Sequence, residues 1–385
     1  MAAGPGPLEA ARTVAPVVAA GRARADRDAR LAPDVVAALG RAGLFRLVAP
    51  REVGGWEASL PEQLDVFEEL GAADPSAAWC VSNAGVAARA GAWLGDEARA
   101  AVFADPAACF SFSNLVAGTA TPVDGGYRLS GRWSVVSGAT HCDWAVLGAR
   151  IVPEGTVAGG GGDPAAVRWM LVPAADLAVD RTWDDASAMR GTGSHTLVVD
   201  GGFVPEHLAH SWDRPVRSTG VLYTLRQTSV TATTAAATSL GAVRAALGEL
   251  VGTLSSYWSS LDDAAPREWA NVQLTVAELD ATRRAAWAGL RAAADEVWTA
   301  AGAGPVPAPV RAALFASADH AVQVSLASVS RAFVCGTGGV LRRGHPLELA
   351  LRDVHGMAVN WERIRRMIFD AGGVLLGQEP RFRAL

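Results

Sequence analysis

Arg128-Leu-Ser-Gly-Arg-Trp-Ser-Val-Val-Ser-Gly-Ala-Thr-His141 is the stretch that decides the fold, and Met189-Arg-Gly-Thr-Gly-Ser-His195 is its counterpart further along the chain. Neither segment has the pattern of a helix or of a plain strand, because Gly, Ser and Thr are concentrated in both. Small side chains leave main-chain N–H groups open to a planar ligand. The two segments therefore predict a binding site for such a ligand.

The composition predicts a folded protein and excludes several kinds of chemistry. A chain of 385 residues with 50% hydrophobic and 19% charged residues buries a substantial core in two or three packed units. The 34 basic and 39 acidic residues give a net charge of -5 and are interspersed, which argues against nucleic-acid binding. The sequence contains no lysine. This absence excludes Schiff-base chemistry on a lysine and a phosphate loop of the GxxxxGK type.

The cysteines and the apolar segments indicate the compartment. Cys80, Cys109, Cys142 and Cys335 stand far apart, with no CxxC pair and no His at ligand spacing, so we expect no metal site. The first residues lack the charged start and apolar core of a secretory signal. The apolar runs are interrupted by Arg, Asp, Glu or several Thr, which argues against a membrane span. We therefore expect a cytoplasmic protein with reduced thiols.

The hydrophobic period changes twice along the chain. Apolar residues recur at helical spacing from Glu9 to about Asp105, and a period of two follows between Ala108 and about Trp212. Helical spacing returns from Thr224 onward, in four long amphipathic stretches. The pattern predicts an α+β fold made of an N-terminal helical domain, a middle antiparallel β domain and a C-terminal four-helix bundle. We place these domains at residues 1–107, 108–213 and 214–385.

Two connections carry turn signals. Gly159-Gly-Gly-Gly-Asp163 is expected to be a solvent loop at a hairpin tip and not a phosphate cradle, because no helix follows it. Pro305-Val-Pro-Ala-Pro309 predicts a tight connection between two bundle helices, because proline cannot continue a helix interior.

Several motifs occur in an order that is informative as a set. They are Ala42 to Trp56, Pro75-Ser-Ala-Ala-Trp79, Val123 to Trp133, Met189 to His195 and Leu351-Arg-Asp-Val-His355. In this order they resemble the acyl-CoA dehydrogenase superfamily, and within it the flavin-dependent monooxygenases of two-component systems, the phenol and aromatic hydroxylase branch. The resemblance spans nearly the whole chain. Each motif is weak alone, and their joint order is a strong signal.

The resemblance implies a flavin between the β domain and the bundle, usually in a homotetramer, with a dimer as the other option. It places Ser137 near flavin N5, where a Ser-Gly turn can supply hydrogen bonds without a bulky side chain. Taken alone, Ser137-Gly138 is more simply a β-turn, and Arg190 equally well pins an interdomain turn or meets a phosphate. The cofactor-binding residues implied by the resemblance are Ser113, Trp133, Ser137, Gly138, Arg190 and Ser194.

The Arg-Asp motif separates two activities. The resemblance implies that a dehydrogenase carries a catalytic Glu shortly after this motif, but that position falls on Trp361 here. Glu362 follows directly and is the base in the alternative of an acyl-CoA dehydrogenase or oxidase, although a solvated, ion-paired helix surface explains it more simply. The monooxygenases commonly place a His where this chain has Asn360. Asn donates a hydrogen bond but cannot shuttle a proton.

Three histidines are candidates for the missing His. His141 follows the Ser-Gly turn and is the better pocket candidate, and His195 with Ser194 is expected to orient the supporting strand. His355 lies a little over one turn before Asn360, so the two need not share a helix face. Our predicted catalytic residues are therefore Ser137, His141, Asn360 and His355. Trp79 and Trp361 could line the pocket of an aromatic substrate by stacking.

The sequence thus predicts a flavin-dependent monooxygenase that takes reduced FAD or FMN from a separate NAD(P)H:flavin reductase. Through a C4a-hydroperoxyflavin formed with O₂, it would hydroxylate a small aromatic or heteroatom-bearing metabolite. The chain has no GxGxxG unit for a nicotinamide of its own. A helical scaffold that has lost its flavin is a third alternative.

Overall fold

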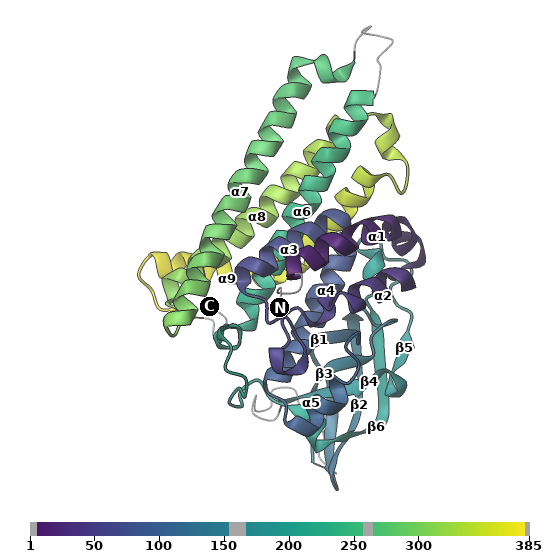
Figure 1. Ribbon diagram of the computed structural model, residues 1–385, viewed down its shortest axis with the longest axis vertical. Coiled ribbons are helices and arrows are strands. Elements are labelled where there is room, and N and C mark those ends of the chain that lie inside the picture. The colour runs from purple at the N-terminus through teal and green to yellow at the C-terminus, as the bar shows by residue number, and fades with distance from the viewer. Residues whose placement is uncertain (1–5, 154–166, 257–264, 382–385) are drawn as a thin grey trace, which may run out of the picture.

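The computed structural model describes residues 6–153, 167–256 and 265–381. The molecule is elongated, with a bundle of long helices at one end, a β-sheet at the other, and the N-terminal helices between them (Figure 1). The Gly159–Asp163 run expected at a hairpin tip lies outside the described residues. No helix in the described ranges combines the length and the apolar character needed to cross a membrane.

The N-terminal part consists of five helices whose starts are set by local sequence signals. They are α1 (Pro7–Asp28), α2 (Pro33–Arg41), α3 (Leu60–Ala73), α4 (Pro75–Ala88) and α5 (Asp96–Val102). A proline occupies the first turn of each of the first four, where its missing N–H costs no hydrogen bond. Ser59 forms a capping box with Glu62 at the start of α3, and Asp74 caps α4 by accepting from Ser76 N.

The described strands form one seven-stranded sheet in the order β5-β6-β2-β1-β3-β4-β7. Their bounds are β1 (Phe110–Val123), β2 (Gly126–Val136), β3 (Trp144–Ile151), β4 (Val167–Pro173), β5 (Ala178–Asp180), β6 (His195–Pro205) and β7 (Ala209–His210). Neighbouring strands are antiparallel, except that β1 and β3 are parallel. The expectation of a wholly antiparallel sheet is wrong at this pair.

The parallel pair has a simple origin. β2 returns along one edge of β1 as a hairpin, and the chain then crosses to the other edge of β1 through residues 137–143 before it enters β3. A period of two in the sequence is the same for parallel and antiparallel strands, so the pattern could not reveal this crossover. The Ser137–Gly138 segment therefore lies in a crossover turn, not in a hairpin.

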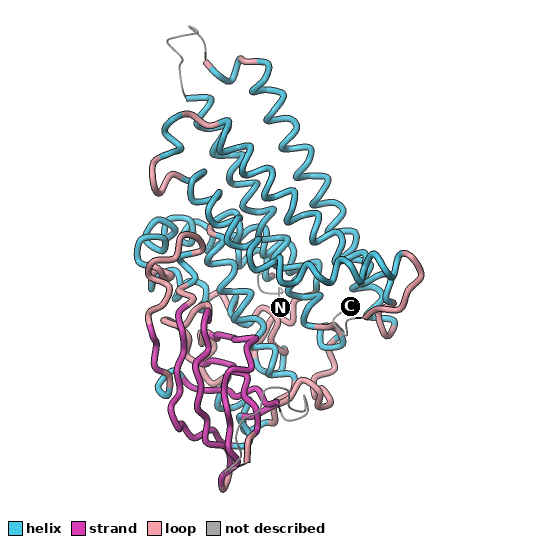
Figure 2. Tube along the Cα trace, turned by 180° about the vertical axis from the view of Figure 1, so that it is seen from behind, coloured by secondary structure: helices cyan, strands magenta, loops and turns pink. Residues whose placement is uncertain are grey.

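Four long helices complete the fold, as the sequence predicts. They are α6 (Gln227–Ser256), α7 (Ala270–Ala303), α8 (Ala308–Cys335) and α9 (Pro346–Leu375), and they run side by side in both views (Figures 1 and 2). The Pro305–Pro309 connection is short, since α7 ends at Ala303 and α8 begins at Ala308.

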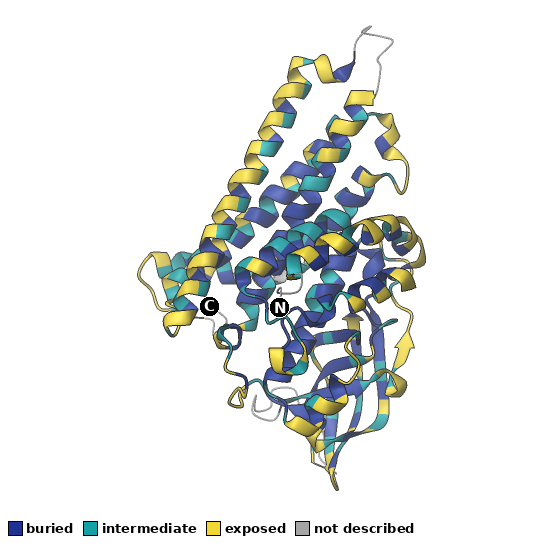
Figure 3. Cartoon of the chain, in the orientation of Figure 1, coloured by how far each residue is buried: buried dark blue, intermediate teal, exposed yellow. Residues whose placement is uncertain are grey.

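The first half of α6 is buried against the N-terminal helices, whereas the far end of the bundle is more exposed (Figure 3). A Cβ added at Gly71 of α3 would lie 2.4 Å from the main-chain oxygen of Thr238, and one at Gly241 of α6 would lie 2.2 Å from that of Glu68. The two helices therefore cross with their backbones in direct contact. The predicted domain boundaries after residues 107 and 213 stay a prediction, because the contact between α3 and α6 joins the first and third parts without showing where either part ends.

Candidate cofactor site

The crossover turn and the loop before β6 lie against each other. The main-chain N–H of Gly138, which has φ +83, donates to Thr192 O at 2.8 Å, and Ser111 Oγ donates to Ser137 O at 2.9 Å. A side chain at Gly138 would meet Ser111 Oγ at 2.8 Å, so both the conformation and the space require glycine here. The two segments that open the sequence analysis are thus brought together by direct hydrogen bonds.

Side-chain hydroxyls join the two segments a second time. Ser137 Oγ lies 2.9 Å from Ser194 Oγ, which lies 2.6 Å from Thr192 Oγ1. Thr192 Oγ1 in turn donates to Met189 O at 2.7 Å. We call Ser137, Ser194 and Thr192 the hydroxyl chain. All three residues are buried, so water competes little for these hydrogen bonds.

His141 is the polar group at this site with the least satisfied hydrogen bonding. Both of its ring nitrogens are enclosed and have no hydrogen-bond partner within the described ranges. Its Nε2 lies 3.4 Å from the position of a Cβ on Gly138. Burial, with a smaller contribution from Arg30, lowers the pKa of His141 to about 4. A neutral imidazole with an unused donor and an unused acceptor fits a site that a polar ligand completes.

Val135 was not identified from the sequence, although it lies two residues before Ser137. It has φ +57 and is 53% exposed, at the irregular end of the β2–β6 pairing. A β-branched residue in the left-handed region is strained, and such strain gathers at functional sites. The Val135-Val136 pair resembles ordinary strand sequence, so no signal pointed to it.

Helix α4 places one side chain against β1 and another against α6. The Asn83 amide donates to Phe112 O at 2.9 Å and accepts from Phe112 N at 2.8 Å, while Ser82 Oγ contacts Thr234 Oγ1 of α6 at 2.9 Å. Trp79 is half-buried. It lies one turn before Ser82 and Asn83, so on the surface of α4 its side chain points between theirs. It therefore lies toward the junction of β1 and α6. The sequence analysis missed Asn83.

Ser113 and His195 support the strands of the site. Ser113 is buried on β1, and its Oγ accepts from Leu115 N at 3.3 Å, next to the irregular pairing of β1 with β3. His195 is fully buried at the start of β6, where its Nδ1 accepts from Trp183 N at 3.1 Å. Burial lowers the pKa of His195 below its usual value. The predicted orienting role of His195 agrees with this placement and stays a prediction.

Trp133 does not offer its ring to a ligand. Its side chain is fully enclosed by protein atoms, its Nε1 donates to Gly148 O at 2.8 Å, and its ring fills the space above Gly118 and Gly131. The expectation of a cofactor contact through this side chain is wrong, because no surface of the ring remains accessible. The Gly138 N–H is likewise used within the protein, so Gly138 contributes the shape of the turn and no hydrogen-bond donor.

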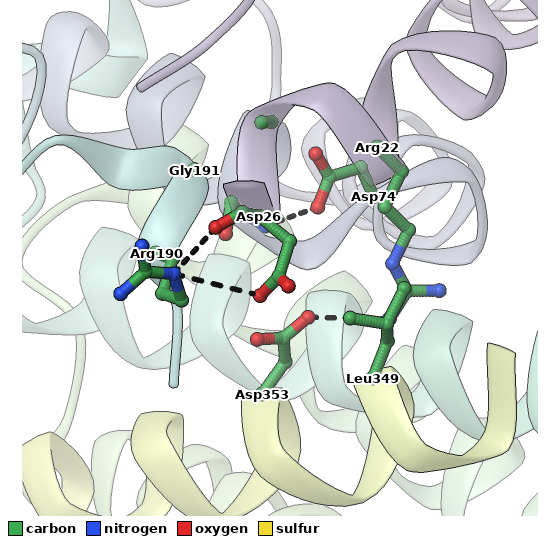
Figure 4. A pocket seen from close by; sticks show the side chains of 9 residues that line it. Arg22, Asp26, Asp74, Arg190, Gly191, Leu349 and Asp353 are labelled. Carbon is green, nitrogen blue, oxygen red and sulfur yellow. Dashed lines mark hydrogen bonds and ion pairs between the residues drawn. The ribbon is translucent and has the colours of Figure 1, made fainter. Parts of the chain in front are cut away.

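Arg190 is structural. Its guanidinium donates to the main-chain oxygens of Asp26, Arg27, Asp184 and Ala186, which pins the loop before β6 to the end of α1. The adjoining cavity measures about 10 Å³ and is lined by Arg22, Asp74 and Asp353 among others (Figure 4). Such a volume holds about one water molecule. The predicted cofactor contact of Arg190 is therefore corrected to the alternative, an interdomain pin.

The Arg-Asp motif on α9 also holds that loop. Asp353 accepts from Met189 N at 2.8 Å and pairs with Arg22 at 3.2 Å, which fixes α9 against both the β domain and α1. Asn360 follows about two turns later on the same face of the helix and is half-buried. This face carries Asn360 in the direction of the β domain.

Three other residues near the end of α9 do not face that way. His355 is exposed, and its Nδ1 lies 2.8 Å from Leu351 O of its own helix. Trp361 is 3% exposed, with its Nε1 donating to Asp319 of α8 at 2.8 Å. His355 and Trp361 therefore do not share the face of α9 that carries Asp353 and Asn360, and their predicted catalytic and pocket-lining roles stay predictions. Glu362 is exposed and pairs with Arg365 at 3.6 Å, as the surface interpretation predicts.

Cavity volume alone does not locate the site. A groove of about 530 Å³ lies between α5 and residues 51–53, with Glu52, Arg99 and Phe103 among its lining residues. It contains none of the predicted site residues, so we base the site on hydrogen bonding and unpartnered groups. Among the described residues no group of three or more His, Cys, Asp or Glu could hold a metal ion.

Comparison with known proteins identifies the family of the chain. Residues 8–105 match the acyl-CoA dehydrogenase N-terminal domain, and residues 233–360 match the acyl-CoA dehydrogenase C-terminal domain. The FADH(2)-dependent resorcinol hydroxylase, oxygenase component, of Rhizobium sp. is 30% identical over 93% of this chain and 91% of its own length. The flavin-dependent monooxygenase oxygenase subunit HsaA of Rhodococcus jostii is 28% identical over 88% of this chain and 90% of its own.

Solved structures show the same fold. XiaF from Streptomyces sp., solved in complex with FADH2 and glycerol, superposes with a TM-score of 0.83 at 27% identity, covering 98% of this chain and 97% of its own. The 3-HSA hydroxylase from Rhodococcus sp. RHA1 gives a TM-score of 0.86 at 24% identity, over 99% and 100% of the two chains. The chain belongs to the acyl-CoA dehydrogenase superfamily, among the flavin-dependent monooxygenase oxygenase components.

Proposed function

We propose that this chain is the oxygenase component of a two-component system that uses reduced flavin and O₂ to hydroxylate a small aromatic metabolite. The observation that carries the proposal is the junction of the crossover turn with the hydroxyl chain. There the buried Ser137 hydroxyl and the unpartnered ring of His141 both adjoin Gly138. A polar planar ligand satisfies both groups.

The residues at this junction suit a flavin. When bound, the flavin supplies the activation of O₂, which no side chain of this protein provides. In our proposal Ser137 holds the N5 edge of the ring, and Asn83 fixes the position of β1 at Phe112. His141 is neutral at pH 7, because its pKa is about 4, so it serves as a hydrogen-bonding group and not as a positive charge.

The substrate end is assigned to α4 and α9. Trp79 offers a partly exposed aromatic face between β1 and α6, which can stack on an aromatic ring and exclude water from it. Asn360 supplies a hydrogen-bond donor from the face of α9 that carries Asp353. Oxidation at carbon is favoured over oxidation at a heteroatom, because the 30% identical relative from Rhizobium sp. is named for the hydroxylation of resorcinol, a phenol.

A dehydrogenase activity is the weaker candidate. Abstraction of a proton α to a thioester requires a carboxylate aimed into the site. Trp361 occupies the register position of that base and is bonded to Asp319, while Glu362 is exposed and paired with Arg365. Neither residue supplies the base.

We further propose that a separate NAD(P)H:flavin reductase delivers the reduced flavin. The sequence has no GxGxxG unit, and the two curated relatives are named as an oxygenase component and an oxygenase subunit. We place the assembled enzyme in the cytoplasm, given its free cysteines.

The proposal is tested by oxygen uptake with a generic flavin reductase, NADH, FAD or FMN, and a panel of phenols and indoles. Incorporation of one ¹⁸O atom from ¹⁸O₂ into a substrate, dependent on this chain, is the expected result. Bleaching of the protein-bound oxidised flavin by an acyl-CoA without O₂, with no labelled product, would contradict it. Failure to bind flavin in either redox state would support the scaffold alternative.

A further inference from the structure

The hydroxyl chain has one fixed end. Its last member, Thr192 Oγ1, lies 2.7 Å from Met189 O, and a carbonyl oxygen can only accept a hydrogen bond. The same oxygen also accepts from Thr192 N at 3.1 Å and from Trp183 Nε1 at 3.2 Å. Met189 itself is held at φ +50 by the bond from its N–H to Asp353. The acceptor therefore cannot turn away, and the Thr192 hydrogen is committed to it.

This fixed end sets the direction of every other hydrogen in the chain. The Thr192 hydrogen points at Met189 O, so at the 2.6 Å contact Ser194 must be the donor and Thr192 the acceptor. The Ser194 hydrogen is then bonded to Thr192, so Ser137 must donate its own hydrogen to Ser194 across 2.9 Å. The reverse order would place two oxygen lone pairs against each other at 2.6 Å. Ser137 thus has only lone pairs left for any further partner.

We propose that Thr192 and Ser194 are positioning residues that hold the Ser137 hydroxyl as an acceptor toward the cofactor, so that the site selects the reduced flavin. The inference rests on the proposed function, because it takes Ser137 to face N5. In reduced flavin N5 carries a hydrogen and donates to this hydroxyl. In oxidised flavin N5 has a lone pair, which faces the lone pairs of Ser137 unfavourably.

The test measures the dissociation constants of reduced and oxidised flavin for the full chain by anaerobic fluorescence titration. For the unchanged protein the reduced form binds more tightly. Thr192→Val removes the fixed end, so that Ser194 and Ser137 can reverse and donate toward the ligand. The ratio of the dissociation constant of oxidised flavin to that of reduced flavin is expected to fall about tenfold, because a gained or lost hydrogen bond changes binding by about that factor. The midpoint potential of the bound flavin should fall by about 30 mV with it.

Three further variants make the test specific. Thr192→Ser keeps the hydroxyl and should restore the ratio, and Ser194→Ala should lower it as Thr192→Val does. If circular dichroism shows that Thr192→Val does not fold, Ser194→Ala takes its place in the test. The matched control is Thr196→Val, a buried β6 residue whose hydroxyl contacts Thr182 at 3.0 Å outside the chain. It should leave the ratio unchanged.

Ser137→Ala separates this inference from the proposed function. If Ser137→Ala weakens reduced-flavin binding while Thr192→Val and Ser194→Ala leave the ratio unchanged, the positioning role is overturned and the flavin site stands. If Ser137→Ala changes neither constant, Ser137 does not face N5, and both the contact and the positioning role fail. A fall in the ratio for Thr192→Val that Thr192→Ser restores supports the inference.

Discussion

Val135 holds the end of β2 in a left-handed conformation that β-branched residues rarely adopt. Its side chain is 53% exposed, so burial of an apolar group does not repay the strain. The neighbouring contacts of Ser137 and Gly138 with the loop before β6 hold the backbone in place instead. The residue therefore keeps the shape of the turn at the expense of stability.

Val135→Gly should stabilise the protein. Glycine adopts positive φ freely, so the free energy of unfolding should rise by about 1 kcal/mol, measured by urea denaturation. The matched control is Ser134→Gly, an exposed neighbour in the same strand that is not at positive φ. It should be neutral or destabilising, because glycine weakens a strand. Equal effects from the two variants would show that Val135 is not strained.

Asp74 is a second residue that affects stability, and its effect depends on pH. It is 2% exposed, and burial, with help from the nearby Asp353 and against the charge of Arg22, raises its pKa to about 7. The folded protein therefore holds a proton that the unfolded chain has lost above its ordinary pKa of 3.8. This contribution to stability is complete below about pH 4 and is lost as the pH rises through about 7.

Asp74→Asn should gain stability relative to the unchanged protein as the pH rises from 5 to 8. Asn keeps an oxygen to cap α4 but does not titrate, and each pKa unit corresponds to about 1.4 kcal/mol. Urea denaturation at several pH values measures the difference. Asp34→Asn is the control, because Asp34 is exposed and its pKa is lowered by Arg24. A pH-independent difference for Asp74→Asn would contradict the raised pKa.

At the scale of elements, the crossing of α3 and α6 fixes the bundle onto the N-terminal helices. Gly71 and Gly241 let the two backbones touch, so any side chain at either position must push the helices apart. Because α4 contacts both α6 and β1 through Ser82 and Asn83, the crossing also sets the distance between the sheet and the bundle. It therefore positions Trp79 relative to the crossover turn.

Gly241→Ala should lower the melting temperature, because the new methyl group would lie 2.2 Å from Glu68 O, a main-chain atom that cannot move alone. We expect a loss of about 1–3 kcal/mol. Gly248→Ala is the matched control in the same helix, where nothing lies within 4 Å of the added atom. It should stabilise α6 by about 0.5–1 kcal/mol. Calorimetry of both variants separates overpacking from helix propensity.

At the scale of the whole molecule, helices α8 and α9 carry apolar side chains that the single chain leaves exposed. They are Val334, Leu341, Val359, Phe369, Leu375 and Leu376, each at least 72% exposed. All of them belong to α8, α9 and the segments that follow these helices. Large apolar side chains exposed along two neighbouring helices are typical of a surface covered by another molecule. We propose that a second copy of this chain covers it, in a homotetramer or dimer.

Phe369→Asp should dissociate the assembly, because Phe369 is 84% exposed in the single chain and would bring a charge into an apolar interface. Light scattering coupled to size exclusion measures the mass. Thr13→Asp adds the same charge on an exposed position of α1 and should leave the mass unchanged. A monomeric unchanged protein at micromolar concentration would contradict the proposal.

The sequence by itself determined the order of helices, sheet and bundle, the positions of the long helices and the motifs that belong to the family. The hydrophobic period, the prolines and the capping residues act on nearby backbone, and the order of the motifs is read directly from the chain. None of these signals depends on contacts between distant residues. The same local information predicted that Ser137, His141 and Ser194 belong to one region, because their motifs are polar where their neighbours are apolar.

Only the tertiary structure decided which of these residues remain available. Trp133 is enclosed by the sheet, Arg190 donates to main-chain oxygens of α1 and of residues 184–186, and His355 is exposed. The parallel pairing of β1 and β3 and the direction of the hydroxyl chain were likewise decided there. Each depends on contacts between residues far apart in the chain, and a periodic pattern contains no information about which distant group a donor meets.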